Sequence, residues 1–225
     1  MASTQSDRAA DRSVRRRIIW PATLAAVLLL VLAGLTLAVR TTPLPLDSAA
    51  LTWVLAHRVP WATTVAVAVT TTGSGLPAYV LAALAGVIAR PRRLWIGMVV
   101  AELALLAGEG VRLLLATWRH RPRPPMGLWL ADANGHSFPS GHTTTSALVA
   151  ALLCTALARR FGGRRRLALQ LVCVAWAVAV GLTRVYLAVH WMTDVLGGWL
   201  LAGGLTLLTS AVVLARRPDQ RMLPV

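Results

Sequence analysis

A histidine and an aspartate stand four residues apart near the end of the chain, as His190 and Asp194. On a helix this spacing puts both side chains on one face. The carboxylate could then hold one imidazole nitrogen and leave the other free for nucleophilic attack. Arg184 precedes the pair and could bind phosphoryl oxygens with both arms of its guanidinium group. The pattern predicts a nucleophilic histidine that acts on a phosphate. The structural alternative is an interfacial arginine with a helix-capping aspartate.

A second histidine follows Pro139-Ser140-Gly141, at the start of an apolar run. A helix that begins there would offer the Ser140 hydroxyl and the Gly141 N–H to an anion, and its dipole would favour negative charge. His142 would stand beside that anion. Taken alone, an ordinary helix cap next to a histidine explains the segment equally well.

Arginines alternate with prolines in the segment Arg119-His120-Arg121-Pro122-Arg123-Pro124-Pro125. Proline stiffens the backbone, so these guanidinium groups could clamp a phosphate or contact lipid headgroups. Upstream, Glu109 and Arg112 are three residues apart in an apolar run. We expect them to pair inside the protein, with Arg112 turned towards the phosphate as the alternative.

The elements that must position these residues are apolar helices. The chain of 225 residues is 56% hydrophobic and only 14% charged, whereas a soluble domain would need more polar surface. Several runs approach or reach the length that crosses a bilayer of about 30 Å. We therefore predict an all-α fold, a polytopic membrane helix bundle of about six transmembrane helices. The expected spans are 18–39, 76–89, 94–118, 143–157, 167–186 and 193–214.

Arginine accounts for all 23 basic residues and gives a formal net charge of +15. Most of these arginines cluster between apolar runs, at 8–17, 90–93, 159–166 and 216–221. This distribution disfavours nucleic-acid binding and fits the positive-inside rule. It predicts a multi-pass protein of the plasma membrane with cytoplasmic tails at 1–17 and 216–225 and a transmembrane domain at 18–215. Segments 119–140 and 187–192 then meet on the extracytoplasmic face.

In order and spacing, these elements resemble the type 2 phosphatidic acid phosphatase (PAP2) superfamily, which includes vanadium-dependent haloperoxidases. The Pro-Ser-Gly-His element is complete, and so is the Arg, His and Asp element, with Thr183 in place of serine. The family's first element is a basic residue, six residues and Arg-Pro. Arg121 and Arg123 both precede proline, but the basic position falls on Leu114 or Ala116. We assign Arg123 to the arginine of this element, and we expect Arg112 or Arg119 to take the place of its basic residue.

The resemblance implies a PAP2-like core and a mechanism that needs no metal ion or cofactor. His190 would attack phosphorus while Asp194 orients it, and His142 would protonate the leaving group and then activate water. The phosphoryl oxygens would be held by arginines and by the start of a helix (Arg123, Arg184, Ser140 and Gly141, with Arg121, Arg119 and Arg112 as further candidates).

A site in the membrane favours a lipid phosphate as substrate, for example phosphatidic acid, phosphatidylglycerol phosphate, or a polyprenyl phosphate or diphosphate. Two alternatives remain at this stage. The chain could be a phosphotransferase that moves the phosphoryl group to an alcohol, or a non-enzymatic lipid transporter or scaffold.

Overall fold

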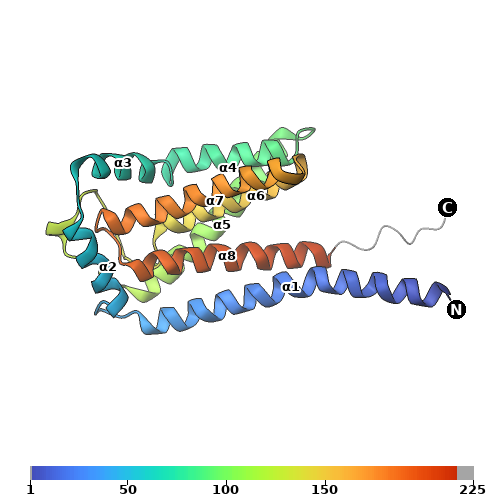
Figure 1. The fold of residues 1–225 in the computed structure, drawn as a ribbon, viewed down its shortest axis with the longest axis horizontal. Coiled ribbons are helices and arrows are strands. Elements are labelled where there is room, and N and C mark those ends of the chain that lie inside the picture. The colour runs from blue at the N-terminus through green and yellow to red at the C-terminus, as the bar shows by residue number, and fades with distance from the viewer. Residues whose placement is uncertain (1, 217–225) are drawn as a thin grey trace.

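A computed structural model describes residues 2–216, with side chains from residue 18 onward. In that part of the chain all regular structure is helical, which confirms the predicted fold class. The elements are α1 (Ala2–Ala38), α2 (Pro45–Ala56), α3 (Pro60–Thr71), α4 (Gly75–Ala89), α5 (Leu94–Arg119), the short 3-10 helix η1 (Met126–Leu128), α6 (Gly141–Arg160), α7 (Gly163–Tyr186) and α8 (Met192–Ala215) (Figure 1).

Five helical segments in the described residues are long and apolar enough to cross a membrane, and a sixth span results if α3 and α4 count as one. The two helices meet at a bend of 52°. Glycines flank Ser74 at this break, and Gly75 has a left-handed backbone with φ of 56°. This break explains why the sequence showed a span of marginal length at 76–89. The structure otherwise reproduces the expected spans, except that α1 already begins at Ala2.

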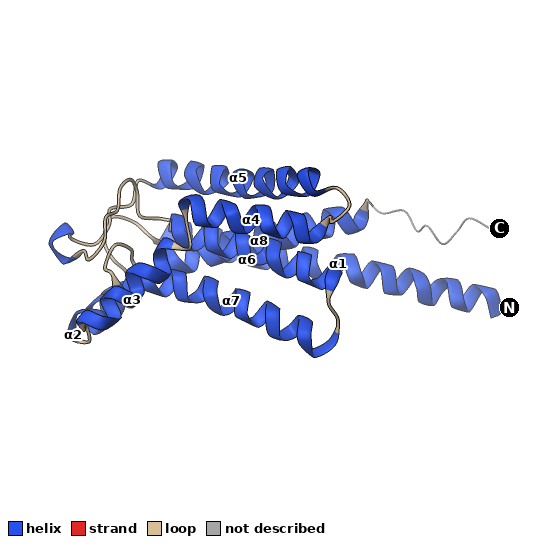
Figure 2. Ribbon diagram, turned by 90° about the horizontal axis from the view of Figure 1, so that it is seen from above, coloured by secondary structure: helices blue, strands red, loops and turns tan. Residues whose placement is uncertain are grey.

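The helices pack as neighbours in an elongated bundle, with α1 alongside α8 and α6 in contact with α4, α5, α7 and α8 (Figures 1 and 2). Helix α6 is the most buried span, since half of its apolar window is covered, compared with 11% for α1. Helices α4 and α5 approach backbone to backbone at Gly86 and Gly97. A Cβ atom at Gly86 would lie 2.2 Å from the Gly97 carbonyl oxygen, so the contact requires glycine.

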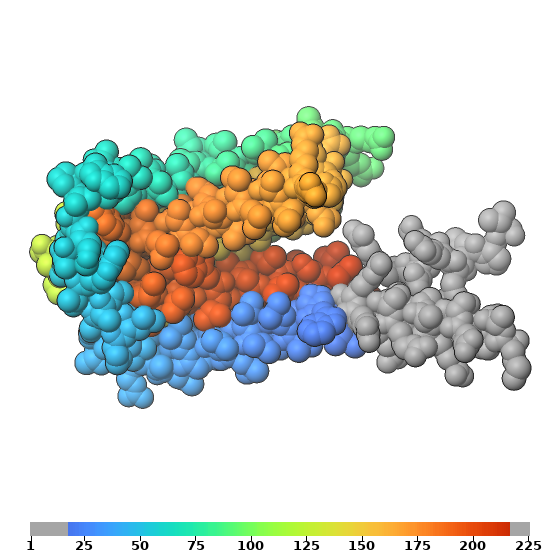
Figure 3. Space-filling model, in the orientation of Figure 1, coloured from blue at the N-terminus to red at the C-terminus, as the bar shows by residue number. Residues whose placement is uncertain are grey.

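Helix α2 lies across one end of the bundle, next to α3 and the loop that follows α5 (Figures 1 and 3). Pro45 stands in its first turn, where the absence of an N–H costs nothing. Asp47 stands in the same turn, and its side chain is buried at 1% exposure. The end covered by α2 therefore receives a buried carboxylate, and it is also the end where the loops 120–140 and 187–191 meet.

Candidate active site

His190 lies between an aspartate and an arginine. Its Nδ1 is 3.3 Å from Asp194 Oδ2, and its Nε2 is 2.8 Å from a terminal nitrogen of Arg123. Arginine can only donate hydrogen bonds, so Nε2 must be the accepting nitrogen and Nδ1 must carry the proton. The structure therefore places a carboxylate at one imidazole nitrogen and leaves the lone pair on the other, as the spacing predicted.

His190 is almost fully buried, at 3% exposure. Burial lowers its pKa to about 4, against the raising influence of the hydrogen bond to Asp194, and the nearby charge of Arg123 lowers it further. The imidazole is consequently neutral at physiological pH. A neutral imidazole is the form that can attack phosphorus.

A tight turn after α7 presents His190 to the site. The N–H groups of Val189 and His190 donate to the Arg184 carbonyl at 3.2 and 3.3 Å. Ala188 adopts a left-handed backbone with φ of 53°, which is uncommon for a residue other than glycine. The Leu130 N–H donates to the Leu187 carbonyl at 3.0 Å and ties the turn to the loop after α5. The turn thus fixes the position of the ring.

Asp194 stands in the first turn of α8 and accepts hydrogen bonds from four groups. Besides His190, the donors are the Trp191 N–H at 2.9 Å, the Ser137 hydroxyl, and the Arg121 guanidinium at 2.5 Å. The Asp194 side chain has no exposed surface. A carboxylate with this many donors stays charged and oriented.

Arg121 joins Asp194 to α2. Its second terminal nitrogen is 2.6 Å from Asp47 Oδ2, and both side chains are buried. Asp47 also accepts from the hydroxyl and the N–H of Thr193, each at 2.8 Å. The covering helix α2 therefore holds the start of α8 through charge as well as packing.

Arg123 is held in place by backbone carbonyls. It donates to Val189 and Asn134 at 2.7 Å and to Gly135 at 3.1 Å. These contacts leave its guanidinium at the reactive nitrogen of His190. Burial lowers the pKa of Arg123. A guanidinium group nevertheless stays charged in proteins.

The start of α6 lies next to this group. Ser140 is the residue before the helix, its N–H donates to the Asp194 carbonyl at 3.0 Å, and its hydroxyl accepts from Thr143. The N–H groups of the first helical residues have no partner within the helix, so they can bind an anion. Half-buried His142 stands in this first turn, within electrostatic reach of His190, Arg123 and Arg184.

Arg112 reaches the same helix end from α5. Its guanidinium carbon lies 3.7 Å from the position of a Cβ atom on Gly141. Arg184 is buried at 2% exposure and donates to the Thr70 hydroxyl at 3.0 Å. The Arg184 Nε has no hydrogen-bond partner among the described residues. Both arginines can therefore donate to a phosphoryl group beside His190 and His142.

Two arginines predicted to bind phosphate have other partners. Arg119 donates to the Val39 carbonyl at 2.6 Å from Nε, and so caps the end of α1. Both terminal nitrogens of Arg121 are occupied by Asp47, Asp194 and Thr193. The structure brings together His142, His190, Asp194, Arg112, Arg123, Arg184, Ser140 and Gly141, and it assigns Arg119 and Arg121 to structural contacts.

Glu109 and Arg112 do not form the expected direct ion pair, which is absent from the ion pairs of the described residues, and the charge of Glu109 acts on Arg112 only from a greater distance. Glu109 instead accepts from the Tyr79 hydroxyl at 2.7 Å and from the Thr145 hydroxyl at 2.8 Å. Arg112 is thus free to turn towards Gly141, which was the alternative reading of the sequence.

Asp47, Ser137 and Thr70 are site residues that were not predicted from the sequence. Asp47 could have been noticed as an acidic residue three positions after Leu44 and two after Pro45, a pattern typical of a helix start. No sequence signal relates it to Arg121, which is 74 residues away. Thr70 likewise has no signal, because its role depends on the bend between α3 and α4.

The chain is similar in sequence and in fold to known proteins. Residues 78–218 match the family model described as the PAP2 superfamily. The chain is 36% identical over 115 residues to phosphatidylglycerophosphatase B of Bacillus subtilis (strain 168), a match that covers 49% of this chain and 54% of that protein. It therefore spans about half the length of this curated relative.

Two solved structures share the fold. A transmembrane PAP2 type phosphatidylglycerolphosphate phosphatase from Bacillus subtilis superposes with a TM-score of 0.73 at 28% identity, covering 88% of this chain and 98% of that one. LpxE of Aquifex aeolicus superposes with a TM-score of 0.59 at 21% identity, covering 80% of this chain and 100% of that one. With its helical bundle and the family model that covers more than half of its length, the chain belongs to the PAP2 superfamily.

Proposed function

We propose that this protein is an integral membrane phosphatase that removes phosphate from a lipid through a phosphohistidine on His190. The observation that carries the proposal is that Asp194 lies 3.3 Å from Nδ1 of the buried His190 while Arg123 lies 2.8 Å from its Nε2. This arrangement provides a neutral nucleophile and a cation at the site where phosphoryl charge would develop.

In the first step, the phosphoryl group of the substrate accepts the hydrogen bond that Arg123 donates to His190 Nε2 in the free protein. The Nε2 lone pair attacks phosphorus, a P–N bond forms, and the bond from phosphorus to the lipid oxygen breaks. His142 gives a proton to that oxygen. Asp194 stabilises the positive charge that the imidazole ring acquires.

In the second step, His142 takes a proton from water, and the resulting hydroxide attacks the phosphohistidine. The P–N bond breaks, inorganic phosphate leaves, and His190 recovers its lone pair. Arg112, Arg123, Arg184 and the Gly141 N–H stabilise the charge on the equatorial oxygens in both steps.

A lipid is the substrate class that this site favours. The reactive groups lie at one end of a bundle of apolar helices, beneath α2. A lipid could keep its tails in the bilayer while its phosphate reaches this end. Because a relative is named phosphatidylglycerophosphatase B, phosphatidylglycerol phosphate is the first substrate to test, before phosphatidic acid and polyprenyl phosphates. We place the site on the extracytoplasmic face, on the basis of the arginine clusters at the other end of the bundle.

The experiment is a substrate panel with the purified full chain in detergent and a direct assay of released phosphate. We expect release from at least one lipid phosphomonoester or diphosphate and none from a His190→Ala variant. His136→Ala is the matched control, because His136 lies in a loop of the same face and should retain activity. Transfer to an added alcohol in place of release would identify a phosphotransferase. Wild-type release by His190→Ala would refute the proposed nucleophile.

A further inference from the structure

The end of the bundle opposite His190 carries a hollow lined almost entirely by arginine. Its volume is about 570 Å³, and its lining residues are Arg90, Pro91, Arg92, Arg93 and Arg160. The first four form the turn between α4 and α5, and the last ends α6. No acidic residue belongs to this lining. A concentration of positive charge of this kind calls for an anion.

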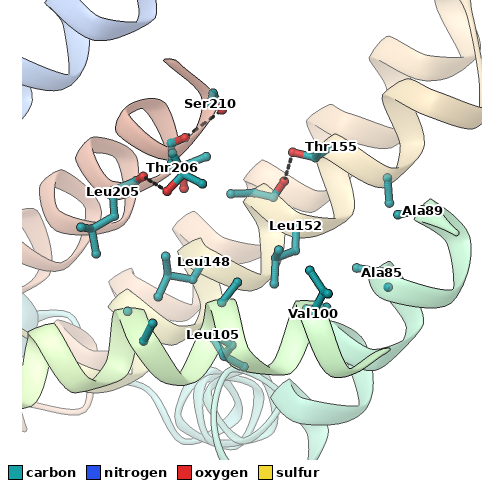
Figure 4. A pocket seen from close by; sticks show the side chains of 18 of the residues that line it. Ala85, Ala89, Val100, Leu105, Leu148, Leu152, Thr155, Leu205, Thr206 and Ser210 are labelled. Atoms are coloured by element: carbon teal, nitrogen blue, oxygen red, sulfur yellow. Dashed lines mark hydrogen bonds between the residues drawn. The ribbon is translucent and has the colours of Figure 1, made fainter. Parts of the chain in front are cut away.

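A groove of about 560 Å³ runs from the same end along α4, α5, α6 and α8. The groove is open because many of the residues on its walls are small (Ala85, Gly86, Ala101, Ala104, Ala107 and Ala151). In addition, α5 packs against α4 and α6 far more than against α8. Figure 4 shows Leu105, Leu148 and Leu205 facing this space from three different helices.

Three of the four hydroxyl groups at the groove have hydrogen-bond partners within their own helices. Thr155 donates to the Ala151 carbonyl, Thr209 to the Leu205 carbonyl and Ser210 to the Thr206 carbonyl, each at 2.8 Å (Figure 4). With these donors satisfied inside their own helices, the walls offer mainly apolar contacts. Such a groove suits a hydrocarbon chain and disfavours a polar solute.

The hollow and the groove adjoin each other, since Arg90 lines both of them. Arg159 also lines the groove at this end. A ligand that fills both must carry negative charge at one end and hydrocarbon at the other. We infer that this surface binds one anionic phospholipid of the leaflet opposite the candidate active site, with its headgroup among Arg90, Arg93 and Arg160 and an acyl chain in the groove.

The proposed lipid lies too far from the candidate catalytic histidines to be a substrate bound for reaction. His142 and Arg159 stand at opposite ends of α6, 17 residues apart in number, which corresponds to about 25 Å at 1.5 Å per residue. A headgroup phosphate bound near Arg159 is therefore far beyond the reach of His190 or His142. The inference concerns a second lipid site, and it does not depend on the proposed catalytic mechanism.

Native mass spectrometry of the full chain, released from lipid nanodiscs, tests the inference with phosphatidylserine as the probe. Phosphatidylserine is an anionic phosphodiester without a terminal phosphate, and phosphatidylcholine is the neutral background. We expect the wild-type protein to retain one phosphatidylserine in preference to phosphatidylcholine. Saturation of the catalytic site with vanadate should not displace it.

Two variants test the two halves of the site. Arg90→Gln with Arg160→Gln removes charge from the hollow, and Ala104→Phe fills the groove from an exposed helix position. We expect each to weaken phosphatidylserine retention at least tenfold. The matched control is Arg164→Gln with Arg166→Gln, which removes the same charge from the start of α7, outside both linings, and should change retention less than twofold.

Three results would overturn the inference. Equal loss in the control variant would show general attraction between lipid and surface charge. Full retention by Ala104→Phe would show that no chain occupies the groove. Displacement of the lipid by glycerophosphoserine at matched concentration would show that the hollow binds a free anion. Thermal unfolding in phosphatidylcholine alone, unchanged between variants, verifies that all of them are folded.

Discussion

Arg121 connects Asp47 of α2 with Asp194 of α8 through contacts of 2.6 and 2.5 Å, and all three side chains are buried. A buried charge without its partner destabilises a protein by about 3–5 kcal/mol, so the three charges must remain together. His190 donates a hydrogen bond to Asp194, so these three charges are connected to the candidate nucleophile. We infer that Asp47 is a positioning residue, which acts on His190 through Arg121 and Asp194.

The first prediction concerns Asp47→Asn. The amide keeps the shape of the side chain but lacks the charge that balances Arg121, so Asp194 should turn further towards Arg121 and away from His190. We expect kcat to fall about 10- to 100-fold, the range for residues that orient an active-site group from the next layer, while KM stays within about threefold. Asp132→Asn, an exposed acidic residue on the same face, is the control. A rise in KM at unchanged kcat would contradict a positioning role.

The second prediction separates Arg112 from Arg119. Arg112 lies beside Gly141, whereas Arg119 caps α1 at the Val39 carbonyl. If Arg112 replaces the family's basic residue, Arg112→Ala should lower kcat/KM about 100-fold, as for the loss of one donor to a developing charge. Arg119→Ala should lower the unfolding free energy by about 1 kcal/mol and leave kcat/KM within about threefold.

Steady-state rates of the two variants decide between these assignments. A greater loss of activity in Arg119→Ala than in Arg112→Ala would reverse them. Ala116→Lys in the Arg112→Ala background restores the family's spacing, and partial recovery of kcat/KM would support the substitution independently.

The spans could be predicted and the candidate reactive residues could be proposed from the sequence because their signals are local. Apolar runs mark the spans, and the four-residue spacing of His190 and Asp194 is a property of one short segment. The clustering of His142 with His190 followed from topology, since arginine clusters placed both loops at one end. That inference needed no knowledge of side-chain contacts.

The structural roles of Arg119 and Arg121 could not be predicted, because they depend on competition between partners distant in sequence. Arg121 and Arg123 both precede proline and look equivalent in the sequence. The buried Asp47 takes Arg121, and the carbonyls of the loop 134–136 take Arg123. Glu109 similarly accepts hydrogen bonds from Tyr79 of α4 and Thr145 of α6 and does not form an ion pair with Arg112.

The third prediction concerns metal ions. The resemblance to PAP2 proteins implies that arginines supply the positive field, and Arg112, Arg123 and Arg184 surround the candidate site. Because arginines would stabilise the charge that develops on the phosphoryl group, chelation of metal ions should matter little. We expect phosphate release to keep at least about 80% of its rate after dialysis against EDTA. Vanadate, which can adopt the geometry of the transferring phosphoryl group, should inhibit. Loss of activity in EDTA with recovery on addition of Mg²⁺ would contradict the prediction.

The fourth prediction concerns pH. The pKa of His190 is lowered to about 4 in the folded protein, whereas an unperturbed histidine has a pKa of about 6.5. Between these values the unfolded chain binds a proton that the folded chain excludes. The stabilising contribution is therefore complete above pH 6.5 and is lost as the pH falls towards 4.

Unfolding free energies in detergent, measured from pH 7 to pH 4, check this expectation. The wild-type curve should fall more steeply than that of His190→Gln, by up to about 1.4 kcal/mol per pH unit for one proton. Parallel curves would show that His190 has an ordinary pKa in the folded state. His57→Gln, at an exposed histidine, is the control and should leave the slope unchanged.

The last prediction separates the two histidines by step. His142 is proposed to protonate the leaving group and later to activate water, and His190 to carry the phosphoryl group. p-Nitrophenyl phosphate has a leaving group that needs no proton. In His142→Ala this substrate should therefore phosphorylate His190 in a burst, and hydrolysis should then be slowed about 10²- to 10⁴-fold, the usual contribution of a general base.

Quenched-flow measurement of nitrophenol and mass spectrometry of the peptide containing residue 190 would detect the trapped intermediate. The burst should vanish in His190→Ala and in the double variant, because both lack the attacking nitrogen. A folded His142→Ala protein without a burst would show that His142 is needed to bind or position the phosphate. Phosphate found on His142 in the wild-type protein would exchange the two roles, and Asp194, which contacts only His190 of the pair, would then have no catalytic partner.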